Sequence, residues 1–511
     1  MNFNRQPSFF DSTLRDGNQA LRKPWNLQEK EFVFNLLMKL GVQVVEVGFP
    51  GSCDMDFHAC QYLANIANEN TEVCGLARTF EKDILQAYEA IKDAKKPRIH
   101  TFVALSPFNM QYVLRKEPED IKKMAIDSVG YAKSLLHGKG RVQFSVEHFG
   151  DCAENMPFVI DTLKEVVAAG ASVINLPNTV ERTRPMDFVK RVEMVVKELP
   201  KDVIVAVHCH NDLGMATATT VESFFAGATQ LEVCLNGLGE RAGNTNIYEV
   251  AVALHNSGID VPLNLHEIYE TALTIAEKSN IAIYEKAPLI GPDALAHRSG
   301  IHQDAAFKTK DMEKGAYRPI HPSLIGRDDE KLGITSQSGK TAVYEIISHA
   351  GFPITMSEAV RITPAIKEAA EKVGELPTRN IIDIYFREIF KVKGPFILDK
   401  LSKITDNKFR VEFRYNNKRY NVVGEDNGPL SACLDALKKA GFEQKLLHYE
   451  QVALDSDIKG VGAEAMTVIK LEAPDGTPVI CRGAHTSVAL ANIRAIFNGL
   501  NIIEQMKAKK Q

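Results

Sequence analysis

Two histidines one residue apart follow an apolar run near the middle of the chain. The run is Val203–Val207, and His208, Cys209 and His210 come directly after it. Alternate side chains of a strand point the same way, so both imidazoles would face one point while Cys209 faces away. The 14 histidines of this 511-residue chain would give roughly 0.4 such pairs by chance, so the pair needs support from other residues.

That support comes from the N-terminus and from a glycine-rich stretch after the histidines. Arg15 and Asp16 follow an apolar Phe-Phe pair, and Asn244 ends the stretch Asn236–Asn244. A carboxylate, two imidazoles and an amide oxygen suit magnesium, manganese or zinc, and they leave positions open for a substrate that chelates through oxygen. Such an ion is a Lewis acid for a carbonyl group. Arg15 beside it would neutralise a developing alkoxide.

The first 260 residues alternate between strand-like and helix-like stretches. Asn26 and Glu29 form a predicted capping box at the start of one helix, and Gly41 ends that helix. Eight apolar stretches are predicted strands: Phe9–Ser12, Val42–Phe49, Glu72–Ala77, Arg98–Leu105, Val142–His148, Ser172–Leu176, Val203–Val207 and Gln230–Leu235. Eight strands with intervening helices in about 250 residues indicate an α/β fold of the (β/α)8 TIM barrel type, whereas a doubly wound sheet usually stops at five or six strands.

A parallel barrel brings the residues that end its strands to one face. The metal-binding candidates follow the first, seventh and eighth predicted strands. Ser145 and Glu147 end the fifth strand, and Asn175 and Thr179 end the sixth. We therefore expect the active site at the carboxyl end of the barrel, where such enzymes build it.

The residues beyond the barrel, predicted as 1–260, form three further parts. Residues 261–350 are a helical subdomain, 351–405 a second subdomain and linker, and 406–511 a C-terminal α+β domain. That domain repeats a hairpin and a helix, with the predicted elements Phe409–Tyr415, Lys418–Val423, Pro429–Ala440, Ala465–Glu472, Pro478–Gly483 and Ser487–Asn498. Because no catalytic groups cluster there, we expect a regulatory binding role.

Composition excludes several classes of protein. The formal charge of −4 is near neutral for this length and the basic residues are scattered, so we expect neither nucleic acid nor membrane as a partner. The eight cysteines contain no Cys-x-x-Cys pair, which argues against zinc ribbons and a disulfide framework. No apolar run approaches ~18 residues, and the first five residues do not resemble a signal peptide. These features indicate a cytoplasmic protein.

Motifs along nearly the whole chain resemble the 2-isopropylmalate synthase family, within a wider group of condensing enzymes that includes homocitrate and citramalate synthases. The matching stretches are Thr13–Leu21, Glu46–Pro50, Arg98–Phe102, Asn175–Thr179, His208–Asp212, Asn236–Asn244, Ser299–Asp304 and Ser336–Lys340. The terminal repeat is similar to the leucine-sensing domain of that family. The resemblance implies a homodimer with acetyl-CoA as co-substrate and leucine as effector.

The resemblance also implies roles for single residues. Asp16, His208 and His210 would bind the divalent metal, with Asn244 as a ligand or close neighbour. Arg15 would polarise the keto oxygen, and Glu147 would help to deprotonate the acetyl methyl group. His302 and Tyr317 of the helical subdomain would reach into the barrel of a partner subunit. The residues implied to surround the substrate are Gln19, His100, Ser145, Asn175 and Thr179.

The implied reaction is a Claisen condensation of acetyl-CoA with 3-methyl-2-oxobutanoate, followed by thioester hydrolysis to 2-isopropylmalate and CoA. Homocitrate synthase, with 2-oxoglutarate as acceptor, and citramalate synthase, with pyruvate, are alternatives of the same class. A 3-hydroxyacyl-CoA lyase on the same barrel is a second class, and a non-catalytic metabolite sensor is a third. The terminal repeat argues against the lyase, and the complete metal-binding set argues against the sensor.

Overall fold

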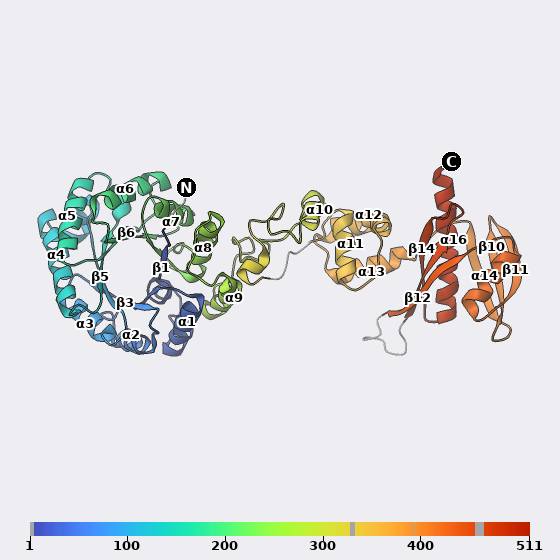
Figure 1. Cartoon of the computed structure of the whole chain (residues 1–511), viewed down its shortest axis with the longest axis horizontal. Coiled ribbons are helices and arrows are strands. Elements are labelled where there is room, and N and C mark those ends of the chain that lie inside the picture. The colour runs from blue at the N-terminus through green and yellow to red at the C-terminus, as the bar shows by residue number, and fades with distance from the viewer. Residues whose placement is uncertain (1–4, 328–332, 391, 455–463, 511) are drawn as a thin grey trace. The chain divides into compact units, whose positions relative to one another are not determined.

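A computed structural model describes residues 5–327, 333–390, 392–454 and 464–510 (Figure 1). Residues 1–4, which belong to the N-terminal stretch judged unlike a signal peptide, lie outside the described residues. The chain divides into two compact units, Met1–Ala296 with Asp311–Lys331 and His297–Lys310 with Leu332–Gln511. Within the described ranges, no helix combines the length and apolarity needed to cross a membrane.

The first unit contains a closed barrel of eight parallel strands, which confirms the predicted fold class (Figure 1). The strands are β1 (Ser8–Asp11), β2 (Val44–Gly48), β3 (Glu72–Arg78), β4 (Pro97–Ala104), β5 (Arg141–Glu147), β6 (Val173–Asn178), β7 (Ile204–Cys209) and β8 (Gln230–Val233). They follow one another around the barrel in chain order, and β1 pairs with β8 to close it. All eight predicted strands are therefore present, with ends that differ by a few residues.

Helices surround the strands, as a parallel barrel requires. They are α1 (Leu27–Leu40), α2 (Asp54–Ile66), α3 (Glu81–Ile91), α4 (Pro118–Leu135), α5 (Met156–Ala169), α6 (Pro185–Glu198), α7 (Ala216–Phe225) and α8 (Ile247–Asn256). The predicted capping box at Asn26 and Glu29 is present. Gly41 ends α1 with φ of 89°, a left-handed conformation that favours glycine. These local signals fix where the first helix starts and where the chain returns to the sheet.

A short helix after the first strand carries two of the predicted site residues. Thr13–Gly17 forms a π-helix, η1, directly after β1, and it carries Arg15 and Asp16. A further helix, α9 (Ile268–Ser279), packs near α1, where the Trp25 indole donates a hydrogen bond to the Lys278 carbonyl oxygen at 3.0 Å.

The second unit contains helices followed by two small sheets. The helices are α10 (Gly300–Lys308), α11 (Lys340–His349), α12 (Met356–Val373) and α13 (Thr378–Ile389). The sheets have the strand orders β11-β10-β9 and β12-β13-β14, from β9 (Phe396–Lys403), β10 (Lys408–Tyr415), β11 (Lys418–Glu425), β12 (Leu446–Leu454), β13 (Glu464–Glu472) and β14 (Pro478–His485). The helices α14 (Pro429–Lys439) and α16 (Val488–Lys510) complete the repeat. Each repeat has one strand more than predicted.

Candidate active site at the carboxyl end of the barrel

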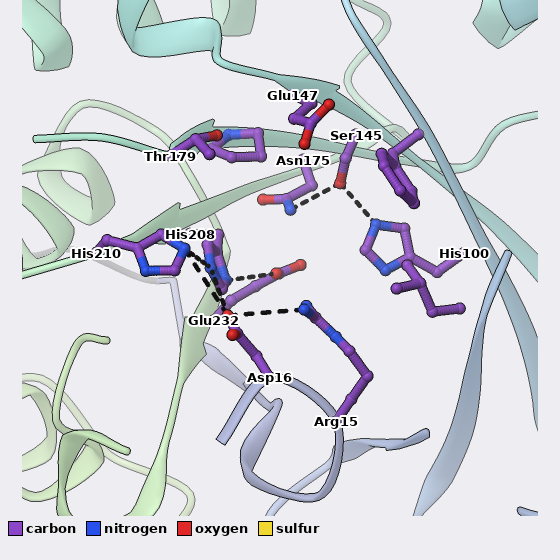
Figure 2. Close-up of a pocket in the computed structure, with 13 residues that line it drawn as sticks. Arg15, Asp16, His100, Ser145, Glu147, Asn175, Thr179, His208, His210 and Glu232 are labelled. Carbon is purple, nitrogen blue, oxygen red and sulfur yellow. Dashed lines mark hydrogen bonds and ion pairs between the residues drawn. The ribbon is translucent and has the colours of Figure 1, made fainter. Parts of the chain in front are cut away.

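A cavity of about 140 Å³ opens where the barrel strands end (Figure 2). Its lining consists of Arg15, Asp16, Leu76, His100, Phe102, Ser145, Glu147, Asn175, Pro177, Thr179, His208, His210 and Glu232. Nine of these residues are predicted site residues, and they come from five separate strand ends and the loops that follow them. The structure therefore brings together side chains that lie far apart in the sequence.

Asp16, His208 and His210 converge on one point and could hold a divalent cation. The two Nε2 atoms lie 3.3 Å apart, and they are 3.5 and 3.8 Å from Asp16 Oδ2, respectively. All three side chains are buried. Strand β7 aims both rings the same way, as the alternation of side chains predicts. A carboxylate and two imidazoles in this arrangement are a typical donor set for a divalent metal with open positions.

The protonation of this cluster also fits a cation site. Although burial opposes it, the positive charges of Arg15 and His208 hold the pKa of Asp16 well below its usual range. Burial and the neighbouring His208 lower the pKa of His210 to about 3. Burial also opposes protonation of His208, but Asp16 and Glu232 raise its pKa to about 9. Asp16 and His210 are thus ready to ligate, and the proton on His208 stands where a bound cation would displace it.

Asn244 joins the cluster through an isolated bridge between its backbone and that of His210. Its Nδ2 donates a hydrogen bond to Asp16 Oδ2 at 3.0 Å, and its buried Oδ1 has no hydrogen-bond partner among the described residues. Because rotation of the amide exchanges its nitrogen and oxygen, Asn244 can turn the unpaired oxygen toward a cation. This buried oxygen without a hydrogen-bond partner is a further reason, besides the donor set, why the residues fit a metal ion.

Gly239 leaves the space that the Asn244 side chain occupies. A methyl group at Gly239 would lie 2.5 Å from Nδ2 and 2.9 Å from Oδ1 of Asn244, closer than real contacts allow. We expect Gly239→Ala to rotate the Asn244 amide away from Asp16 and to weaken metal binding about 10-fold, as loss of a group beside a metal does. A titration of the metal-stripped protein with Mn²⁺ measures this change.

The control for this substitution is Gly130→Ala in α4. A methyl group there would meet no atom within 4 Å, and alanine favours the helix, so metal affinity should not change. Equal Mn²⁺ affinity in Gly239→Ala and wild-type protein would contradict the role given to Asn244.

A second polar chain runs across the cavity from Arg15. The Arg15 guanidinium donates from Nε to Glu46 Oε2 at 2.5 Å, and Glu46 Oε1 lies 2.6 Å from His100 Nδ1. His100 Nε2 lies 2.6 Å from Ser145 Oγ, which accepts a hydrogen bond from Asn175 Nδ2 at 2.9 Å. Glu46 is buried, yet Arg15 and His100 lower its pKa to about 2 against the opposing effect of burial. The carboxylate therefore fixes the guanidinium and the imidazole relative to each other.

Glu46 and Glu232 received no predicted role, although both belong to this site. Glu46 lies inside the otherwise apolar strand β2, Glu232 lies between Leu231 and Val233 in β8, and each points into the barrel. A charged residue inside a predicted buried strand could have revealed them, because burying a charge costs free energy unless the charge is paired. Which way it points depends on the register of the barrel, and the sequence alone does not give that register.

Four predicted residues do not line the cavity: Asn244, which contacts Asp16 from beside it, and three others. Gln19 is exposed just after η1. His302 lies exposed on α10 in the second unit, with its ring centroid 6.4 Å from that of His297. Tyr317 is exposed in the segment Asp311–Lys331 of the first unit. The roles given to these residues stay predictions.

Family models match three consecutive parts of the chain. One described as HMGL-like matches residues 6–275, more than half of the chain. One described as homocitrate synthase post-HMGL domain-like matches residues 289–374. The third, described as LeuA allosteric (dimerisation) domain, matches residues 376–504.

Several curated proteins that are similar to this chain are named 2-isopropylmalate synthase. The 2-isopropylmalate synthase 2 of Leptospira interrogans serogroup Icterohaemorrhagiae serovar Lai (strain 56601) is 55% identical over 369 residues, which cover 72% of this chain and 86% of that protein. The 2-isopropylmalate synthase of Nitratidesulfovibrio vulgaris (strain DSM 19637 / Miyazaki F) is 32% identical, with 98% and 97% covered. That of Pyrococcus furiosus (strain ATCC 43587 / DSM 3638 / JCM 8422 / Vc1) is 33% identical, with 98% and 100% covered.

Proposed function

The chain belongs to the 2-isopropylmalate synthase family, and from this premise we propose that it condenses acetyl-CoA with 3-methyl-2-oxobutanoate and releases 2-isopropylmalate and CoA. The observation that carries the proposal is the meeting of Asp16, His208 and His210 at one point of a cavity that also holds Arg15 and Glu147. That set would supply a cation site, a fixed positive charge and a base around one cavity.

We propose that Asp16, His208 and His210 hold magnesium, manganese or zinc, with Asn244 as a further ligand or neighbour. When bound, the ion would polarise the ketone of the 2-oxo acid. Arg15 would place its guanidinium against the keto oxygen and stabilise the alkoxide that forms there. Its pairing with Glu46 holds the group in position before the reaction, so little reorganisation is needed.

Glu147 is the proposed base for the acetyl methyl group. It lines the cavity on the side away from Arg15 and Asp16 (Figure 2), and burial raises the pKa of its carboxyl group. A raised pKa makes the carboxylate a stronger base near neutral pH. The methyl group gives up a proton, its carbon bonds to the keto carbon, and the alkoxide is protonated. Water then cleaves the thioester to the carboxylate and free CoA.

The cavity wall supports a small branched acceptor. Leu76, Phe102 and Pro177 supply its apolar part. Arg15 is the one arginine or lysine among the described residues that line the cavity, and Glu46 already engages it. A 2-oxoglutarate acceptor would need another cation for its distal carboxylate, so 3-methyl-2-oxobutanoate fits better than the acceptor of a homocitrate synthase.

Release of free CoA tests this function directly. A thiol reagent follows the reaction while 3-methyl-2-oxobutanoate, pyruvate and 2-oxoglutarate are compared as acceptors. We expect the highest kcat/KM with 3-methyl-2-oxobutanoate and no reaction after the metal is stripped. A rate that does not depend on any 2-oxo acid would reject the proposal, and cleavage of a 3-hydroxyacyl-CoA without such an acid would indicate a lyase.

The other proposed features follow from the same family. We propose a cytoplasmic homodimer in which His302 and Tyr317 of one subunit complete the site of the other. The parts 1–260, 261–350, 351–405 and 406–511 would serve as barrel, active-site subdomain, second subdomain with linker, and regulatory domain. Leucine is the proposed effector of the last part, supported by the match to a LeuA allosteric domain.

Removal of residues 394–511 is expected to abolish inhibition by leucine while CoA release persists. The cut precedes β9 because β9 pairs with β10, and a cut near residue 409 would leave β9 without its partner strand. Rates with and without leucine are compared for the full chain and the truncated chain, and a thermal melt checks that the barrel still folds. Leucine inhibition that survives the truncation would reject this assignment.

A further inference from the structure

A chain of buried polar side chains fills the barrel interior beneath the cation site. Arg98 is only 1% exposed, and its Nη1 donates hydrogen bonds to Gln143 Oε1 at 2.9 Å and to Gln230 Oε1 at 2.6 Å. Its Nη2 pairs with Glu72. Gln143 in turn donates from Nε2 to Glu232 Oε1 at 2.6 Å. Oε1 of Glu232 is therefore fixed by a hydrogen bond from this interior chain.

The other oxygen of Glu232 faces a proposed metal ligand. Oε2 lies 3.2 Å from His208 Nδ1, and the two residues are direct neighbours in the register of β7 and β8. Both atoms are buried, and among the described residues neither forms a hydrogen bond of good geometry, so each polar atom lies closest to the other without a competing partner. Each is thus the natural partner of the other.

The negative charge of Glu232 is not needed to neutralise Arg98. Glu72 pairs directly with that guanidinium, whereas Arg98 reaches Glu232 through the neutral amides of Gln143 and Gln230. A buried carboxylate is costly unless it is paired, and the ionisable group that lies beside Glu232 is His208. The negative charge of Glu232 can therefore act on the cation site. If Glu232 served only to accept hydrogen bonds in the interior, a glutamine could take its place.

We propose that Glu232 is a positioning residue for the metal site. It accepts a hydrogen bond from Nδ1–H of His208, so the lone pair of Nε2 is directed at the point shared with Asp16 and His210. Gln143 and Arg98 hold the carboxylate in that position. A carboxylate behind a ligating histidine fixes the tautomer of the ring and makes it a stronger ligand. This inference rests on the proposed function, which makes His208 a metal ligand.

The test compares Glu232→Gln with Glu72→Gln in the full-length protein. Both substitutions remove one buried carboxylate from the same interior chain, but only Glu232 faces His208. Mn²⁺ affinity of the metal-stripped proteins is measured by the EPR signal of free Mn²⁺, together with the melting temperature without metal and kcat and KM at varied Mn²⁺. For Glu232→Gln we expect an Mn²⁺ Kd raised about 10- to 100-fold. Most of kcat should return at saturating Mn²⁺.

Glu72→Gln is expected to lower the melting temperature, because it leaves Arg98 without its direct partner, and to keep the wild-type Mn²⁺ affinity. Where Glu232→Gln does not fold, Glu232→Asp replaces it; it keeps the charge but withdraws the carboxylate from His208, so the Kd should still rise. Wild-type affinity in the Glu232 variant, or equal weakening by both substitutions, would overturn the inference. Failure of the wild-type protein to bind Mn²⁺ would instead overturn the proposed function, and this inference with it.

Discussion

Replacement of Asp16 by asparagine is expected to lower CoA release by about 10³-fold or more, since it removes the charged ligand of a cation that contributes several kcal/mol to the transition state. The Oδ2 atom of Asp16 is the carboxylate oxygen that lies next to both imidazole rings. The Arg15 guanidinium also lies near it, with Nη1 at 3.6 Å. Asparagine keeps the shape of the side chain, so the barrel should still fold. Initial rates at increasing Mn²⁺ or Mg²⁺ concentration measure the effect.

Asp11 provides a matched control for this substitution. It is a fully buried carboxylate in the same segment, but it accepts hydrogen bonds from the backbone nitrogen and hydroxyl of Thr13 and does not line the cavity. Asp11→Asn should lower stability and leave the rate of the folded enzyme nearly unchanged. Wild-type turnover in Asp16→Asn, or an equal loss in both variants, would contradict the cation site.

Replacement of Glu147 by glutamine is expected to reduce kcat/KM by about 10²- to 10⁴-fold, the usual contribution of a general base. A base works only when it is deprotonated, so the wild-type rate should fall as pH drops through the pKa of Glu147. Because burial raises that pKa, the acid limb of the pH profile should lie above the ordinary range of a glutamate. The profile of kcat/KM against pH for both proteins measures this.

Glu249 is a suitable control for the base. Burial also raises the pKa of its carboxyl group, but the group accepts a hydrogen bond from Thr217 Oγ1 at 2.7 Å and does not line the cavity. Glu249→Gln should therefore keep both the rate and the acid limb. An unchanged rate in Glu147→Gln, or an acid limb at the pH of an ordinary glutamate, would remove Glu147 from the mechanism.

The barrel was predictable because its strands are buried on both faces. Such strands appear as continuous apolar runs, and glycines at helix ends mark where the runs begin, as at Gly41, Gly170 and Gly227, all with positive φ. Strand β9 was missed for the opposite reason, since most of its residues are half-buried or exposed and its pattern is weakly apolar. Strand β12 was missed as well, and it becomes evident only through its pairing with β13.

Residues of the candidate site were predictable where polar or charged side chains follow the end of a predicted strand. Asp16, His208 and His210 predict a cation site because few other roles combine a carboxylate and two imidazoles at strand ends, and the structure brings these three side chains together. Glu46 and Glu232 depend on the barrel register, which decides whether a charged side chain points inward. The register is a property of all eight strands together, so no single stretch of sequence reveals it.

Anomalous diffraction from crystals of the metal-stripped protein soaked in Mn²⁺ tests the central claim most directly. One strong peak per chain is expected, within about 2.0–2.3 Å of Asp16 Oδ2 and of Nε2 of His208 and His210. A protein saturated with Mn²⁺ that shows its peak at other residues, or no peak in the barrel, would contradict the account of this site.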